Sequence, residues 1–198
     1  MKNTKQHILK SAVELFLQKT YKEVTMKEIV EKTGLSKGAF YHYFQSKEQL
    51  FKEVLDTFLT SSMEVKWDTY PQNSLKDFIN RILAFSHEVL LKMQMGMDQA
   101  FDLNYFSLYF DGLKLFPDFQ TTLSKHQQDE LNAWIKTVGN ARKSGEIKSS
   151  MTDEQIARIF THVSDGSLLT LLLQRSKNPV AIDYIKVLWE GLYNQIRA

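Results

Sequence analysis

Residues 33–50 read TGLSKGAFYHYFQSKEQL and hold the side chains with the clearest chemical potential in this 198-residue sequence. The stretch contains two serines that can cap helices, two lysines and five aromatic rings, counting that of His42. Unpaired N–H groups at a helix N-terminus, together with small and cationic side chains, suit contacts with phosphates and base edges. These residue types therefore point to nucleic-acid binding.

The first turn of a short helix expected over residues 37–44 supplies the candidate base contacts. Lys37 can donate to guanine O6 and N7, Gly38 leaves room for close approach of the backbone, and the Ala39 methyl can touch a thymine methyl. Polar atoms on neighbouring side chains can reach phosphates, and those side chains belong to Tyr41, His42, Tyr43 and Lys47.

Capping residues and apolar spacing predict the helices that hold this stretch. A first helix over roughly 4–19 is indicated by the stripe Leu9, Ala12, Val13 and Phe16. Thr25 and Glu28 form a capping box that starts a second helix at about residue 26, and Gly34 offers the positive φ that commonly ends one. Ser36 then caps the third helix. Because the turn between the second and third helices is so short, the arrangement is a helix-turn-helix.

The rest of the sequence predicts further helices and no convincing pair of strands. Helix starts are marked by capping or first-turn residues at Ser46, Ser74, Pro117, Thr152 and Asn178 with Pro179. Phe40 and Phe44 share one face of the third helix and are expected in the core. We therefore expect an all-α chain of about nine helices, with a DNA-binding domain over residues 1–50 and a helical effector-binding and dimerisation bundle over 51–198.

Charge and composition agree with this division. Residues 1–50 carry nine lysines and five glutamates, a net charge of +4, within a chain whose total is +2. This asymmetry hints at a polyanionic partner for one end, although a solvated lysine face gives the same pattern. The chain has no cysteine, which excludes disulfides and thiolate zinc sites. No apolar run or signal peptide is recognisable, so a cytoplasmic location is expected.

The segment VTMKEIVEKTGLSKGAFYHYFQSKEQLF resembles the DNA-binding region of the TetR family of bacterial transcriptional regulators. The similarity spans roughly residues 8–55 and consists of a threonine-capped second helix, a Gly-hydrophobic-Ser turn, an aromatic-rich recognition helix and a following Ser-Lys-Glu. The rest of the chain resembles the family in helix count and length.

The resemblance implies DNA contacts at defined positions. Thr25 and Ser36 would contact phosphates as well as cap helices, and Lys27 would reach a base or the backbone. Lys37, Gly38 and Ala39 would contact base edges. The DNA backbone on either side of the groove would be held by Tyr41, His42, Tyr43 and Lys47. Phe40 stands where a smaller aliphatic residue is commoner, and Ala39 replaces a frequent threonine or serine, which leaves one phosphate contact in question.

The resemblance also implies a homodimer built from the last two helices. The final helix carries apolar residues at alternating intervals of three and four positions, a pattern that suits pairing with another helix. These residues are Ile182, Ile185, Trp189, Leu192 and Ile196. A second apolar face is marked by Tyr184, Leu188 and Gly191. Interface positions expected on the preceding helix are Phe160, Val163, Gly166 and Ser167. Burial within one chain explains the apolar run at 168–173 equally well.

Residues 93–119 are rich in methionine and aromatic side chains, and this zone borders a small-molecule pocket in the family. Methionine suits a cavity that accepts apolar or variable ligands, although such a stripe is more often plain core. Candidate pocket residues are Met93, Met97, Phe101, Tyr105, Phe106 and Tyr109, with Trp67 and Trp134 as weaker candidates. The expected effector is an apolar or amphipathic small molecule.

Enzyme classes find little support in the sequence. Di-iron carboxylate bundles need Glu-x-x-His pairs, and no histidine here follows a glutamate at that spacing. The GxSxG and GxxxxGK motifs are absent, and no cofactor or metal is expected. His162 and Asp165 share a helical face, where a solvated pair is commoner than a catalytic dyad.

The expected function is a ligand-responsive transcriptional regulator, most simply a repressor, that binds a palindromic operator as a dimer and is released by its effector. The alternative is an all-helical protein-interaction module without sequence-specific DNA binding.

Overall fold

The computed structural model describes residues 2–60, 65–96, 103–173 and 180–198. Within these ranges all regular structure is helical, apart from one isolated bridge between Ile147 and Arg197. The expected all-α fold class is therefore confirmed. The α-helices are α1 (Lys2–Phe16), α2 (Met26–Thr33), α3 (Lys37–Tyr41), α4 (Lys47–Val54), α6 (Leu75–Gly96), α7 (Leu103–Leu115), α8 (Pro117–Ser144), α9 (Asp153–Leu173) and α10 (Val180–Ile196).

Two short helical segments complete the described structure. A π-helical turn, η1 (Leu55–Thr60), continues α4, and a 3-10 turn, η2 (Trp67–Thr69), precedes α6. None of the helices in the described ranges combines the length and the apolar character that crossing a bilayer requires.

The chain divides into two compact units. The first comprises Met1–Glu64 with Phe101–Ser124, and the second comprises Val65–Ala100 with Lys125–Ala198. The division at residue 50 stays a prediction, and the first unit extends beyond that residue through η1 and α7.

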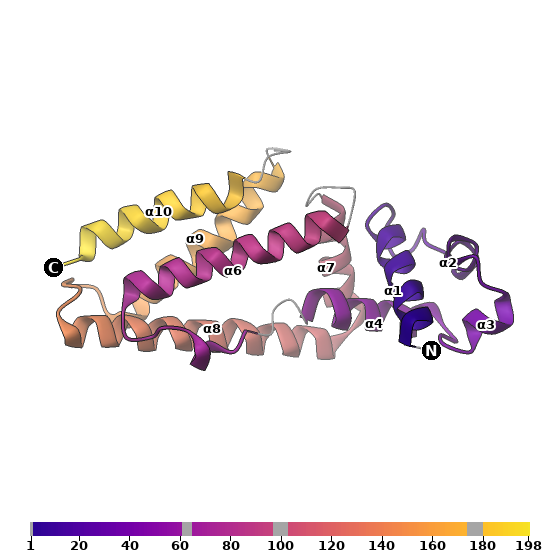
Figure 1. The fold of residues 1–198 in the computed structure, drawn as a ribbon, viewed down its shortest axis with the longest axis horizontal. Coiled ribbons are helices and arrows are strands. Elements are labelled where there is room, and N and C mark those ends of the chain that lie inside the picture. Colours follow the sequence, from indigo (N-terminus) through magenta and orange to yellow (C-terminus); the bar gives the residue numbers. More distant parts are fainter. Residues whose placement is uncertain (1, 61–64, 97–102, 174–179) are drawn as a thin grey trace. The chain divides into compact units, whose positions relative to one another are not determined.

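The core of the first unit holds the helix-turn-helix together. α1 packs against both α2 and α4 (Figure 1). The stripe expected on the first helix is buried, and it consists of Leu9, Ala12, Val13 and Phe16. Phe40 and Phe44 are fully buried in the same core, so their expected anchoring role is confirmed.

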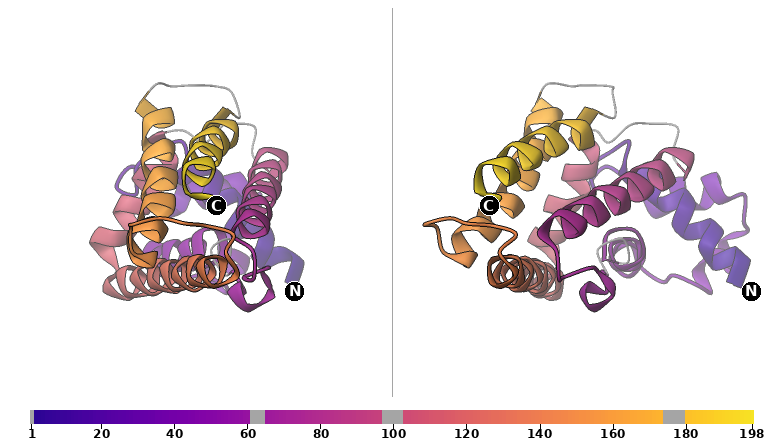
Figure 2. Two further views of the ribbon diagram at one scale, coloured as in Figure 1. Left: turned by 90° about the vertical axis from the view of Figure 1, so that its left-hand side faces the viewer. Right: turned by 60° about the vertical axis from the view of Figure 1, so that its left-hand side comes forward.

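The second unit has an aromatic core centred on Trp134. This ring stacks on Phe160 at a centroid distance of 4.7 Å and meets Phe78 and Trp189 edge-on at 4.9 and 5.1 Å. The Trp189 indole N–H donates to the Phe160 carbonyl at 3.0 Å, which ties α10 to α9. These two helices are in contact, and the left-hand view of Figure 2 shows them side by side.

Most helix boundaries follow the expected caps. The hydroxyls of Ser46, Ser74 and Thr152 each accept a backbone N–H from the residue three positions later, at 3.1 to 3.2 Å. Gly145, directly after α8, has a φ of 80°. The third helix is shorter than expected and ends at Tyr41. The cap expected at Asn178 and Pro179 lies outside the described residues.

Candidate nucleic-acid interface

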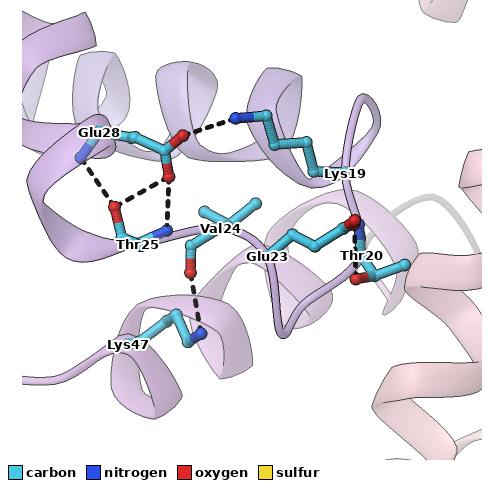
Figure 3. Close-up of polar contacts among 7 residues, drawn as sticks. All are labelled: Lys19, Thr20, Glu23, Val24, Thr25, Glu28 and Lys47. Carbon is cyan, nitrogen blue, oxygen red and sulfur yellow. Dashed lines mark hydrogen bonds and ion pairs between the residues drawn. The ribbon is translucent and has the colours of Figure 1, made fainter.

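A reciprocal cap fixes the N-terminus of α2. The Thr25 hydroxyl accepts from the Glu28 N–H at 3.2 Å, and a Glu28 carboxylate oxygen accepts from the Thr25 N–H at 2.9 Å (Figure 3). The Lys19 ammonium, 2.5 Å from that carboxylate, and the two Thr25 donors lower the pKa of Glu28 to about 2. The predicted capping box is therefore present.

Thr25 and Ser36 differ in the proton that each can offer to a phosphate. The Thr25 hydroxyl donates to Glu28 at 2.8 Å, so in this geometry it has no proton for another acceptor. The Ser36 oxygen accepts from the Ala39 N–H at 3.3 Å and caps α3, and its own proton meets no acceptor among the described residues. Of these two predicted phosphate contacts, the geometry favours Ser36.

The first turn of α3 is open to solvent. Ser36, Lys37, Gly38 and Ala39 are all exposed. A Cβ placed at Gly38 would meet no atom within 4 Å, so this position leaves space for a groove wall. The next residue, Phe40, is fully buried, so its ring anchors α3 in the core while the preceding turn stays exposed.

The lysines around α3 differ in their partners. The Lys27 ammonium lies 3.8 Å from Glu31, and the Lys32 ammonium lies 3.0 Å from Glu14. Lys37 forms neither an ion pair nor a hydrogen bond with any residue that the structure describes. Its charge therefore remains available to an external anion.

Lys47, the first residue of α4, is anchored within its own unit. Its ammonium donates to the carbonyl oxygens of Tyr21 and Val24, both at 2.8 Å, and Figure 3 shows the second bond. It also lies 4.3 Å from the centroid of the Tyr21 ring. An ammonium has three N–H donors, so one remains for a phosphate. Lys47 therefore joins the α1–α2 loop to α4, a role that the sequence did not reveal.

Three further residues predicted to contact DNA follow the first turn of α3. Tyr41 is 42% exposed, His42 is exposed and Tyr43 is half-buried. The His42 and Tyr43 rings meet edge-on at 5.4 Å. Tyr41 and His42 lie at the surface, Tyr43 is partly covered, and the contacts of all three with DNA stay predictions.

Two polar contacts within the first unit join the helix-turn-helix to later helices. Asp111 of α7 accepts from the Tyr21 N–H at 3.1 Å, and Asp118 of α8 lies 3.3 Å from the Lys52 ammonium. The partners in the first contact are 90 residues apart in sequence, so no local pattern could have indicated it. Because Lys47 also bonds Tyr21, Asp111 and Lys47 meet on one loop residue.

The predicted pocket residues are not gathered at one described site. Met97 and Phe101, and the side chains of Met93 and Tyr105, lie outside the described residues. Phe106 and Tyr109 are half-buried in the first unit. In the second unit, Trp67 is half-buried and Trp134 is fully buried in the aromatic core, where it serves packing.

Most residues of the predicted dimer seam pack against the core of their own chain, and their contact with a second copy stays a prediction. Phe160, Trp189 and Ile196 are at most 3% exposed, and Ser167 is equally buried. The partly buried members pack against the same core, and they are Val163, Ile185 and Leu192. Ile182 is half-buried, and Gly166 is exposed. The face that is open instead carries Tyr184, Val187 and Leu188, with exposed fractions of 46, 66 and 38%.

Comparison with known proteins connects this geometry to a family. The model of the bacterial regulatory proteins of the tetR family matches residues 8–54. The HTH-type transcriptional regulator YdgC of Bacillus subtilis is 30% identical over 183 residues, which cover 90% of this chain and 86% of YdgC. The HTH-type transcriptional repressor DhaR of Mycobacterium sp. is 20% identical and covers 95% of this chain and 91% of DhaR. For other curated relatives, the match covers only 30 or 34% of their length.

Solved structures show the same fold. A transcriptional regulator from Saccharomonospora viridis, crystallised in complex with choline, superposes with a TM-score of 0.70 over all of both chains at 15% identity. The similarity to YdgC along most of both chains, the matched family model and the observed helix-turn-helix lead to one assignment: the chain belongs to the TetR family of helix-turn-helix transcriptional regulators.

Proposed function

We propose that this protein is a cytoplasmic repressor that binds a palindromic operator as a homodimer and leaves it when a small-molecule effector binds. The observation that carries the proposal is the exposed first turn of α3, with an unpaired Lys37 beside the open backbone at Gly38. No enzymatic role is proposed.

The DNA contacts in the proposal follow from the donors and the open space around the first turn of α3. Lys37 donates to base edges, Gly38 and Ala39 allow close approach, and Ser36 donates its hydroxyl proton to a phosphate. Tyr41, His42 and Tyr43 reach phosphates beside the groove, with Lys27 at the end of α2 nearest the cap. Lys47 chiefly holds the turn in position and offers its third N–H to the backbone.

The open apolar face of the second unit is the proposed dimer contact. It combines Tyr184, Val187 and Leu188 of α10 with Ile159 and Leu169 of α9, two helices that pack side by side. Large exposed apolar patches are typical of protein interfaces, and these exposed side chains on two packed helices are the candidates for one. The dimer would place two recognition helices in successive major grooves, about 34 to 36 Å apart.

Two of the comparisons support the regulatory part of the proposal. DhaR carries the name of a transcriptional repressor, and the S. viridis regulator was crystallised with a small molecule. For an effector to release DNA, the two ligands must prefer different states of the dimer. A coupling of about 1 to 3 kcal/mol, or roughly 5- to 150-fold in affinity, is typical.

Selection of binding sites from random duplex DNA with the purified protein tests the proposal. We expect an enriched palindrome for the native protein and a degenerate base at one position of each half-site for Lys37→Ala. Lys136→Ala serves as a control, because that exposed lysine belongs to α8 in the second unit and is not among the predicted DNA contacts. If no sequence were enriched, the protein-interaction module would be the better description.

A further inference from the structure

The loop between α1 and α2, residues 17–25, ends at Thr25, the residue that caps α2. Within this loop, the Glu23 carboxylate accepts from both the N–H and the hydroxyl of Thr20 at 2.8 Å, which closes a local turn (Figure 3). Such local bonds shape the loop but do not fix where it lies in the unit. Its position therefore depends on its bonds to other helices.

Tyr21 is the loop residue that both α4 and α7 hold. Its carbonyl accepts from the Lys47 ammonium of α4 at 2.8 Å, and its N–H donates to the Asp111 carboxylate of α7 at 3.1 Å. Its ring packs against Phe51 of α4 at a centroid distance of 4.7 Å. Among the described residues, the Tyr21 N–H has no acceptor other than Asp111.

Close packing fixes α7 beside this loop. A Cβ added to Gly112, the residue after Asp111, would lie 2.8 Å from a carbon of the Phe119 ring and 3.0 Å from Leu55 Cδ1. Leu108, one turn earlier on α7, is buried in the same core as the helix-turn-helix. Because the glycine lets α7 approach η1 and α8 this closely, the Asp111 carboxylate has a defined position from which to hold the loop.

We infer that Asp111 is a positioning residue for DNA binding, which acts by holding the Tyr21 N–H and thereby the α1–α2 loop. The loop leads directly into the Thr25 cap of α2, and Lys47, which holds the same loop residue, is the first residue of the helix after α3. Contacts at Tyr21 therefore act on both ends of the helix-turn-helix. The effect on DNA rests on the proposed function, whereas the bond itself does not.

Removal of the Asp111 carboxylate has two opposite effects on DNA binding. A negative charge in a DNA-binding unit repels phosphates, so its loss alone should leave affinity unchanged or raise it. Loss of the bond should lower affinity, because a released loop must be ordered again when DNA binds. Alanine is a better helix former than aspartate, so Asp111→Ala does not weaken α7 through helix propensity. Weaker DNA binding by this variant therefore reports on the bond.

Hydrogen exchange and DNA binding of two Asp111 variants test this role. Asp111→Asn removes the charge but keeps an oxygen that can accept from the Tyr21 N–H, whereas Asp111→Ala removes both. In the absence of DNA, we expect the Tyr21 amide to exchange at least about tenfold faster in Asp111→Ala and at a near-native rate in Asp111→Asn. On the most enriched duplex from the site selection, affinity should fall at least about threefold in Asp111→Ala alone.

Asp118→Ala is the matched control. This aspartate carries the same charge in the same unit, but its contact is a side-chain ion pair with Lys52 of α4 at 3.3 Å. We expect the control to retain both the slow exchange of Tyr21 and the native DNA affinity.

Several outcomes would overturn the role of Asp111. These are native exchange of Tyr21 in Asp111→Ala, faster exchange with unchanged DNA affinity, or an equal loss of affinity in Asp111→Asn or Asp118→Ala. Faster exchange throughout α1 as well as the loop would show general unfolding and would also count against it. If the native protein selected no duplex, the proposed function and the effect on DNA would fail together, while exchange would still report on the bond.

Discussion

Replacing Glu130 with glutamine should stabilise the free protein, and the gain should depend on pH. Folding desolvates this carboxyl of α8 and raises its pKa from 4.5 to about 7, so the folded chain binds its proton more tightly than the unfolded chain. The stability of the native protein is therefore lowered as pH rises between these two values. A pKa difference of about 2.5 corresponds to about 3 kcal/mol at pH 8.

Glutamine removes this penalty because it carries no charge and keeps an oxygen that can accept from the Trp134 N–H. We expect Glu130→Gln to raise the free energy of unfolding by about 3 kcal/mol at pH 8 and by less than about 1 kcal/mol at pH 5. Urea unfolding at a fixed protein concentration measures both values, since a dimer makes stability depend on concentration. Asp129→Asn, at the exposed neighbouring position on α8, is the matched control for removing a carboxylate. An equal effect of Glu130→Gln at both pH values would refute the desolvation of Glu130.

Three further variants separate the remaining roles. Lys37→Ala should relax sequence choice in a DNA-binding titration and leave the melting temperature unchanged, because Lys37 has no partner among the described residues. Lys47→Ala should lower the melting temperature as well as DNA affinity, since two carbonyls lose a charged donor worth about 1.5 to 3 kcal/mol each; an unchanged melting temperature would contradict its anchoring role. Val187→Glu should yield monomers in analytical ultracentrifugation. An intact dimer would show that the open face of α10 is not the dimer contact.

Local sequence patterns predicted the helix-turn-helix well. Caps such as Thr25 with Glu28 involve residues three positions apart, so their geometry is largely contained in the sequence. The same holds for Phe40 and Phe44, whose spacing fixed their common buried face. The chemistry of the exposed first turn of α3 could therefore be read before its position was known.

Long-range contacts could not be predicted in this way. The bonds of Lys47 to the α1–α2 loop and of Asp111 to Tyr21 depend on how distant helices pack. The last helix has two apolar faces, and nothing in its spacing indicates which one meets its own chain. Packing assigns the Trp189 face to the core and leaves the Val187 face open. The burial of Glu130 could have been suspected from the sequence, because this carboxylate lies one helical turn before Trp134, which is fully buried.

The exposed first turn of α3 is the part of the molecule that we propose reads DNA sequence. Fluorescence anisotropy on the duplex upstream of the protein's own gene, against a shuffled duplex and at two salt concentrations, tests it most directly. We expect tighter binding to the upstream duplex, a loss of affinity at the higher salt, and loss of the preference in Lys37→Ala. Equal, weak binding to both duplexes by the native protein and by Lys37→Ala would contradict it.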